Sequence, residues 1–199
     1  MKLILASNNA HKLREMKEIL SPFFDEIVSM KEAGIDHETV EDGKTFMENA
    51  VKKAKELAEI SGCCAIADDS GLCVDALAGA PGIFSARYAG VHGDDKANNR
   101  RLLRELESEH DRGAHYTCAI ALAWPDGKLL TAEDYLYGEI AYDERGTNGF
   151  GYDPLFLLKE RGLRTAELSP EEKNAISHRG KALRKLVEEL KAQETPAAE

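Results

Sequence analysis

The first half of the chain alternates between short apolar runs and stretches with one apolar face. Residues 3–6 are apolar, and a polar loop separates them from residues 13–20, where hydrophobic side chains recur at helical spacing. Residues 26–29 look like a second strand, and residues 34–43 are polar. The pattern predicts a strand, a loop, a helix, a second strand and a long loop, in that order.

The best-marked helix of this half follows the long loop. Thr45, with Glu48 three residues later, forms a capping box, and one apolar helix face then continues as far as Gly62. Residues 64–67 form a compact apolar run that reads as a strand. We expect this strand to end in a turn at residues 68–71, which read Asp-Asp-Ser-Gly.

The second half mixes long strands with helices. Residues 72–77 and 155–158 are short apolar runs, and residues 94–109 have a helical pattern. Residues 115–124 and 129–141 form two long runs joined by Pro-Asp-Gly-Lys, a sequence that suits a hairpin turn. Because a hairpin of long strands occurs beside strand-helix units, we predict a sheet that is mixed rather than wholly parallel.

The last helix has a well-marked start. Ser169 is a favoured N-cap residue, Pro170 suits the first helical position, and Glu172 completes a capping box. We expect this helix to run to about Lys191. Because no internal repeat or low-complexity linker interrupts the chain, we predict one α/β domain covering residues 1–199.

Charge and hydrophobicity narrow the functional classes. The 199 residues carry a formal net charge of −10, which disfavours a protein that coats nucleic acid, because such binding relies on clustered Lys and Arg. No stretch approaches the roughly 20 apolar residues that span a bilayer, and residues 1–9 lack the longer apolar run and small-residue cleavage site typical of a signal peptide. We therefore expect a cytoplasmic protein without nucleic-acid or membrane partners. A small anionic substrate would need a basic pocket, a divalent metal, or both.

Acidic residues beside the apolar run at 64–67 are candidates for metal chemistry. Asp68 and Asp69 follow a strand, where α/β proteins often bind ligands, and Mg²⁺ takes oxygen ligands from one or two carboxylates. One aspartate could also orient or deprotonate a water molecule. Alternatively, one aspartate caps the turn and the other is solvated. Glu41 is a second candidate ligand, or part of an ordinary acidic loop.

The first loop and two helices carry groups that suit phosphate. The loop and the start of the following helix supply a hydroxyl, two amides and a cation: Ser7, Asn8, Asn9 and Lys12. Such groups at a helix N-terminus favour an anion, although helix capping explains the same residues, and the P-loop pattern is missing. Lys53 lies beside the apolar stripe of its helix, where it can reach a phosphate or remain a surface lysine.

Two later segments suit a nucleoside. The glycines of residues 146–154 do not have dinucleotide spacing, but those around Phe150 let backbone approach a ligand while the ring offers a stacking platform. A buried Phe in a tight turn is the alternative. Lys173, His178 and Arg179 can donate to a phosphate or a base carbonyl, or they form the basic side of an amphipathic helix.

Together these motifs closely resemble the inosine triphosphate pyrophosphatase family, enzymes that hydrolyse ITP, dITP and XTP. The resemblance covers nearly the whole chain and is carried by the first loop with Lys12 and by four longer segments: EDGKTFMENA (41–50), ADDSGLCVDALAGAPGIFSARYAG (67–90), GFGYDPLF (149–156) and ELSPEEKNAISHRGKAL (167–183). It implies Mg²⁺-dependent hydrolysis of these nucleotides to monophosphate and pyrophosphate. It also implies a homodimer, and an elongated mixed sheet flanked by helices in two lobes with the active site in the cleft between them.

The resemblance also implies a role for each candidate residue. Phosphate binding is implied for Ser7, Asn8, Asn9, Lys12 and Lys53, and substrate contact for Ser70. Metal binding is implied for Glu41 and Asp69, and catalysis for Asp69 and Asp68. The nucleoside pocket would include Phe150, Gly151, Tyr152 and Asp153, with Lys173 on the nucleotide and His178 and Arg179 closing on the base.

Three other functions fit part of this pattern. The structurally related Maf pyrophosphatases typically have Ser-Pro-Arg-Arg where this chain has Ser-Asn-Asn-Ala at residues 7–10. A nucleotide sensor without turnover would keep the lysines and Phe150 but would gain nothing from Glu41 and Asp69. A phosphatase that trims terminal phosphates would release orthophosphate instead of pyrophosphate.

Overall fold

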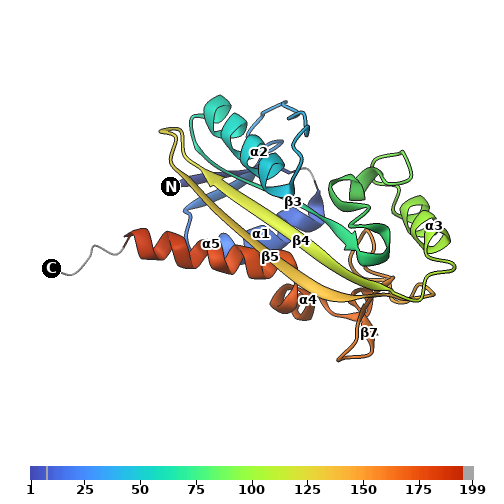
Figure 1. Ribbon diagram of the computed structural model, residues 1–199. Coiled ribbons are helices and arrows are strands. Elements are labelled where there is room, and N and C mark those ends of the chain that lie inside the picture. Colours follow the sequence, from blue (N-terminus) through green and yellow to red (C-terminus); the bar gives the residue numbers. More distant parts are fainter. Residues whose placement is uncertain (8, 195–199) are drawn as a thin grey trace. The chain divides into compact units, whose positions relative to one another are not determined.

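The computed structural model of the protein describes residues 1–7 and 9–194, with the backbone alone at residue 194 (Figure 1). Its described strands form one seven-stranded sheet in the order β2-β1-β3-β4-β5-β6-β7. Strand β1 (Lys2–Leu5) pairs in parallel with β2 (Glu26–Ser29) on one side and with β3 (Cys64–Val74) on the other. The hairpin strands β4 (Gly113–Ala123) and β5 (Leu129–Ile140) follow.

The far end of the sheet is antiparallel. Strand β5 pairs with β6 (Phe156–Leu158), and β6 pairs with β7 (Leu163–Arg164). The hairpin turn between β4 and β5 is closed by a hydrogen bond of 2.9 Å from Trp124 N–H to Lys128 O. Parallel and antiparallel pairs therefore occur in one sheet, and the prediction of an α/β fold on a mixed sheet is confirmed.

Five helices and three short 3₁₀ segments complete the described chain. The helices are α1 (Ala10–Leu20), α2 (Phe46–Ser61), α3 (Asp95–Glu105), α4 (Pro170–Ile176) and α5 (His178–Glu194). The 3₁₀ segments are η1 (Asp75–Leu77), η2 (Gly82–Arg87) and η3 (Thr165–Glu167). Among the residues described, no helix is both long enough and apolar enough to span a membrane.

Local capping signals placed the starts of α2 and α4 correctly. Thr45 Oγ1 accepts from Glu48 N–H at 3.1 Å and starts α2, and Gly62 ends it in the left-handed conformation. The second half of the expected box differs, because the Glu48 carboxylate accepts from Lys44 N–H instead of Thr45 N–H. The box at Ser169 is complete and starts α4.

Two expectations about element boundaries are wrong. The turn expected at residues 68–71 is absent, because β3 continues through them to Val74. The separate strand expected at 72–77 is also absent, because residues 72–74 belong to β3 and residues 75–77 form η1. The single helix expected from 169 to about 191 is broken at Ser177, which has extended backbone with φ −64° and ψ 153°. In the strand, tertiary packing outweighs the local signal, since Leu72 and Val74 are buried in the core.

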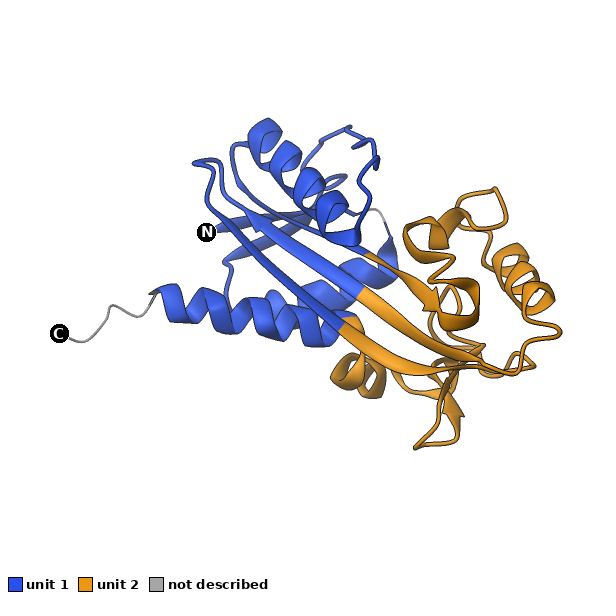
Figure 2. Ribbon diagram, viewed as in Figure 1, with its two compact units in different colours: residues 1–69, 118–134, 179–199 blue, residues 70–117, 135–178 orange. Residues whose placement is uncertain are grey.

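The chain divides into two compact units (Figure 2). Unit 1 comprises residues 1–69, 118–134 and 179–199, and unit 2 comprises residues 70–117 and 135–178. Unit 1 has two hydrophobic clusters, one with side chains from α1 and α5 and the other with side chains from α2, and unit 2 has one, which includes side chains from α3. Each unit therefore has its own core.

Candidate active site

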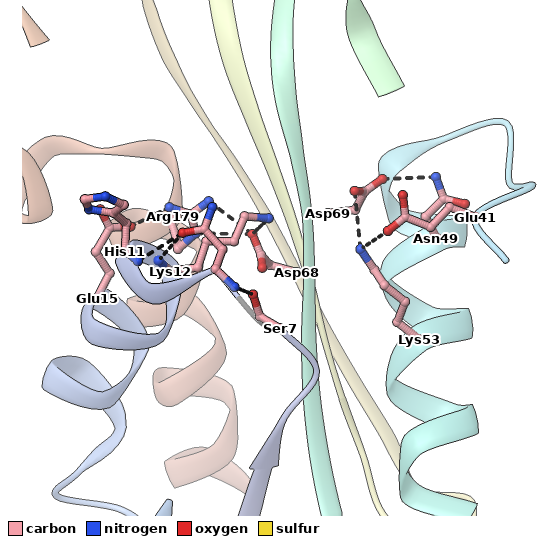
Figure 3. Close-up of polar contacts among 11 residues, drawn as sticks. Ser7, His11, Lys12, Glu15, Glu41, Asn49, Lys53, Asp68, Asp69 and Arg179 are labelled. Atoms are coloured by element: carbon pink, nitrogen blue, oxygen red, sulfur yellow. Dashed lines mark hydrogen bonds and ion pairs between the residues drawn. The ribbon is translucent and has the colours of Figure 1, made fainter. Parts of the chain in front are cut away.

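Strand β3 sends its two adjacent aspartates to opposite faces of the sheet. Successive side chains of a strand alternate between the two faces. Cys64 and Ile66 accordingly pack in the cluster with α1 and α5, whereas Ala65 and Ala67 pack in the cluster with α2. The same alternation puts Asp68 on the side of α1 and α5, and Asp69 on the side of α2, as Figure 3 shows.

On the first face, Asp68 lies among buried charges. Its Oδ2 atom contacts Lys12 Nζ at 2.9 Å and accepts from both Nε and Nη2 of Arg179 at 3.2 Å. The same guanidinium donates from Nη1 to Glu15. The side chains of Asp68 and Arg179 are 1% and 2% exposed. This charge cluster, which consists of Lys12, Glu15, Asp68 and Arg179, is part of the interior of unit 1.

Arg179 is the central cation of this cluster. Burial alone would lower its pKa, but the carboxylates of Asp68 and Glu15 outweigh burial and raise the pKa above its ordinary value. The guanidinium therefore stays charged at any working pH, and two carboxylates share it. Because Arg179 is held in this way, its contacts in the structure are with protein carboxylates, and its expected contact with a base stays a prediction.

On the second face, Lys53 lies between two carboxylates. Its Nζ donates to Glu41 Oε1 at 2.8 Å and contacts Asp69 Oδ1 at 3.4 Å. Asn49, one helical turn earlier on α2, donates from Nδ2 to Asp69 Oδ2 at 3.0 Å and accepts from Gly43 N–H at 2.8 Å. Helix α2 thereby holds both Asp69 and the loop that carries Glu41. These four side chains, Glu41, Asn49, Lys53 and Asp69, form the carboxylate–lysine cluster.

In this second cluster, Asp69 binds a proton more readily than an aspartate exposed to water does. Burial raises the pKa of Asp69, and neighbouring Lys53 and Asn49 only partly oppose that effect. For Lys53, burial lowers the pKa, but Asp69, Asp68 and Glu41 together raise it above the ordinary value. A permanently charged ammonium therefore faces a carboxylate that is easier to protonate than usual.

Glu41 and Asp69 are also the oxygen donors that suit a divalent cation. Within residues 1–7 and 9–194, no group of three or more Asp, Glu, His or Cys side chains is arranged as a complete metal site. Mg²⁺ does not need one, because it uses one or two carboxylates and takes its other ligands from water and substrate phosphates. Two carboxylates around one ammonium leave a net negative charge, so the residues fit such a cation.

The first loop is organised by helix capping. Asn9 is the N-cap of α1, and its Oδ1 accepts from His11 N–H at 3.0 Å and from Lys12 N–H at 3.2 Å. Ser7 Oγ accepts from Asn9 N–H at 3.1 Å. The capping interpretation is therefore confirmed for Asn9, while the anion interpretation stays open. Asn8, predicted as a third member of this loop, lies outside the described residues.

In unit 2, Asp153 organises the Gly-rich loop. Its Oδ2 accepts from Lys173 Nζ at 2.6 Å and from Phe150 N–H at 2.8 Å, and its Oδ1 accepts from Thr165 Oγ1 at 2.9 Å. The Lys173 ammonium also lies 4.6 Å from the centre of the Phe150 ring, within cation–π range. The structure thus brings three predicted residues together, with Phe150 only partly buried.

The remaining candidates of unit 2 are tied into its core. Tyr152 is buried, and its hydroxyl donates to Ser85 O at 2.8 Å. The His178 ring stacks on Tyr116, with ring centres 4.8 Å apart. Ser70 follows Asp69 on β3 and is partly buried.

Sequence reasoning missed several partners of the candidate residues. Glu15 lies three residues after Lys12 on the inward side of α1, and that spacing was a usable signal. Thr165 and Tyr116 gave no comparable signal, because they meet Asp153 and His178 only through the tertiary fold. Asn49, four residues before Lys53 beside the apolar stripe of α2, could be singled out from that spacing, and its partner is Asp69.

The fold and the two clusters of unit 1 define an α/β protein that gathers lysines and carboxylates on both faces of strand β3. Comparison with known proteins gives the family. The Ham1 family model matches residues 3–189. A relative from Clostridium perfringens, named dITP/XTP pyrophosphatase, is 52% identical over 198 residues, covering 96% of this chain and 97% of the relative.

Solved structures agree with that match. A HAM1 protein from Coxiella burnetii aligns with a TM-score of 0.88 and 42% identity, covering 96% of this chain and 99% of that one. A Mycobacterium abscessus structure, named nucleoside-triphosphatase / dITP/XTP pyrophosphatase, aligns with a TM-score of 0.77 and 43% identity, covering 94% and 99%. The chain belongs to the Ham1 family.

Proposed function

We propose that this protein hydrolyses nonstandard purine nucleoside triphosphates, namely dITP, ITP and XTP, to the nucleoside monophosphate and pyrophosphate. Such an activity removes these nucleotides from the pool before they enter DNA or RNA. The observation that carries the proposal is the carboxylate–lysine cluster, in which Lys53 lies between Glu41 and Asp69. Relatives that are 52% and 51% identical bear the name dITP/XTP pyrophosphatase, which supports the same substrate class.

Unit 1 supplies the groups for triphosphate and metal. Lys12 and Lys53 provide two cations for phosphate oxygens, and Ser7 and Asn9 provide further donors at the N-terminus of α1. Asn8 is proposed as a further donor on the family resemblance alone. Glu41 and Asp69 would hold Mg²⁺, which, when bound, supplies positive charge against the phosphate oxygens. Ser70, next to Asp69, would donate its hydroxyl to the substrate.

Asp69 is the proposed general base. Its pKa is raised by burial, so it can accept a proton from a water molecule more readily than an exposed aspartate can. Asn49 holds one of its oxygens at 3.0 Å and thereby fixes the direction of the other. Asp68 is less suited, because two cations, Lys12 and Arg179, contact its Oδ2 and favour the charged carboxylate over the protonated one. We assign Asp68 the role of holding Lys12 in place for a phosphate.

Attack at the α-phosphorus accounts for the products. A water directed by Asp69 forms the new phosphorus–oxygen bond, and the bond to the bridging oxygen breaks. Pyrophosphate then leaves as one unit, and the proton passes to the Asp69 carboxylate. Lys12 and Lys53 stabilise the charge that develops on the phosphate oxygens.

Unit 2 supplies the groups for the nucleoside. Phe150, partly exposed and held by Asp153, is the proposed stacking platform for the base, and Gly151 and Tyr152 fix its backbone. Lys173 approaches the same ring and would contact the nucleotide. His178, at the start of α5, is proposed to contribute to base recognition. Arg179, the next residue, belongs to unit 1, where it contacts Asp68 and Glu15.

Three wider features complete the proposal. The two units act as one catalytic domain, since one family match runs across both units. The protein works in the cytoplasm, and it is a homodimer.

A panel of nucleotides tests the proposal directly. ITP, dITP, XTP, GTP and ATP are incubated with the protein and Mg²⁺, and both the nucleotide and the inorganic product are identified. We expect monophosphate and pyrophosphate in equal amounts from ITP and XTP, with ATP about 10²-fold poorer in kcat/KM, because adenine leaves buried polar groups unsatisfied. Accumulation of IDP and orthophosphate would instead indicate a terminal phosphatase, and binding without products would indicate a sensor.

A further inference from the structure

Helix α3 grips the Gly-rich loop of unit 2 at a single residue, Gly151. The Gly151 N–H donates to Asp95 Oδ2 at 2.7 Å, and Asn99 Nδ2 donates to Gly151 O at 3.2 Å. Asp95 and Asn99 are four residues apart on α3, so their side chains lie one turn apart on the same face of the helix. One helix thus holds both backbone polar groups of one loop residue.

This grip acts directly on Phe150. The Gly151 N–H belongs to the peptide plane that also contains the Cα and carbonyl of Phe150, so fixing this N–H fixes one of the two planes that set the direction of the Phe150 side chain. Gly151 has φ +62° and no atom near its missing Cβ, so the conformation, not the space, requires glycine. The Phe150 N–H is held in turn by Asp153.

Asn99 is an unfavourable choice for packing alone. The residue is 3% exposed, and its Oδ1 atom has no hydrogen-bond partner in the described part of the chain. A buried polar atom without a partner opposes folding, so an apolar side chain of similar size would pack at least as well. The contact from Asn99 Nδ2 to Gly151 O is what the asparagine adds.

We propose that Asp95 and Asn99 are positioning residues for base selection, which set the orientation of the Phe150 ring on which the purine stacks. The inference rests on the proposed function, because it takes Phe150 as the base platform. Both residues act through Gly151 and not on the reacting phosphate. Their loss therefore raises KM and weakens discrimination between bases, while kcat stays close to that of the wild type.

Two neighbouring asparagines give a matched pair of variants. Asn98 is 2% exposed and lies next to Asn99 on α3, but its amide holds another segment, accepting from Ala89 N–H at 2.7 Å and donating to Ala86 O at 3.4 Å. Asn99→Leu should raise the KM for ITP about 10-fold, the factor expected for one lost hydrogen bond, with no loss of Tm. Asn98→Leu should lower Tm and leave the KM within about 2-fold of the wild type.

Asp95 provides a conservative rescue. Asp95→Ala removes the acceptor for Gly151 N–H and should raise the KM for ITP about 10-fold, as Asn99→Leu does. Asp95→Asn keeps an oxygen at the same place and should restore a KM within about 3-fold of the wild type. In Asp95→Ala and Asn99→Leu the preference for ITP over ATP in kcat/KM should also fall, whereas in Asn98→Leu it should not.

Amide hydrogen exchange at Gly151 tests the grip without substrate. Asp95→Ala should speed this exchange about 10-fold, and Asn98→Leu should leave it unchanged. Unchanged exchange in Asp95→Ala would overturn the grip itself. Faster exchange with an unaltered KM and base preference would overturn the positioning role. Failure of the wild type to hydrolyse ITP would overturn the proposed function. The exchange measurement uses no substrate, so the two failures can be distinguished.

Discussion

Removal of the Arg179 side chain is expected to destabilise the protein severely. The guanidinium is 2% exposed and contacts the buried carboxylates of Asp68 and Glu15. Arg179→Ala leaves these carboxylates with one cation fewer, and breaking a buried ion pair costs about 3–5 kcal/mol. For a chain of 199 residues, 1 kcal/mol corresponds to about 2–4 °C in Tm. The expected fall in Tm is therefore about 6–20 °C.

Thermal unfolding followed by circular dichroism measures this effect. Arg184→Ala is the matched control, because Arg184 is exposed on the same helix, and it should change Tm by no more than about 2 °C. The folded-state pKa of Arg179 is raised above its unfolded value. The contribution of Arg179 to stability is therefore fully present below its unfolded-state pKa. The difference in Tm between the wild type and Arg179→Ala should be the same at pH 6 and pH 9.

The opposite result would restore the role that the sequence implied for Arg179. If Arg179→Ala unfolds at the wild-type temperature but loses its preference among bases, the guanidinium serves the ligand and not the buried carboxylates. A lysine at this position separates the two further. Arg179→Lys keeps a charge but loses the two-atom contact with Asp68, so its Tm should fall between those of the wild type and the alanine variant.

Four further results are expected. Asp69→Asn should nearly abolish kcat while the protein stays folded, and a near wild-type kcat would remove Asp69 from the mechanism. Lys53→Ala and Lys12→Ala should lower kcat/KM for all triphosphates alike, whereas Phe150→Ala should change their ranking, as a nucleotide panel would show. Chelation with EDTA should abolish turnover and added Mg²⁺ should restore it; activity that survives EDTA would contradict the metal assignment. The pKa of Glu32 is lowered to about 2 by hydrogen bonds from Ser29 and Lys17, so the Tm difference between the wild type and Glu32→Gln should be full above pH 4.5 and should vanish as the pH falls towards 2.

The sequence predicts those parts of the fold that local chemistry decides. The N-caps at Thr45 and Ser169 and the left-handed Gly62 use atoms within a few residues of each other, so their signals can be read without knowing the fold. The course of β3 through residues 68–71 depends on burial contributed by distant segments. The Asp-Asp-Ser-Gly pattern therefore indicated a turn that tertiary packing does not allow.

The candidate site likewise has residues that the sequence predicts and contacts that only the folded chain creates. Glu41, Lys53 and Asp69 could be selected from their residue types and from the family resemblance, and the structure brings them together. Asp68 and Asp69 lie on opposite faces because the strand is continuous through them. A sequence that predicts a turn at these residues cannot predict this separation. Likewise, the grip of α3 on Gly151 joins residues more than fifty positions apart and leaves no local pattern.

Strand β3 separates the side chains that contact Asp68 from those that contact Asp69. It does not prevent electrostatic interaction between charges on its two faces. Lys12, on the Asp68 side, lowers the pKa of Asp69, and Asp68 raises the pKa of Lys53 on the far side. A rate lost in Lys12→Ala therefore has two sources, one at the phosphate and one in the proton affinity of Asp69. Loss of the phosphate contact lowers the rate at every pH, whereas a changed pKa of Asp69 moves the pH–rate profile along the pH axis. Comparing the profile of Lys12→Ala with that of the wild type therefore separates them.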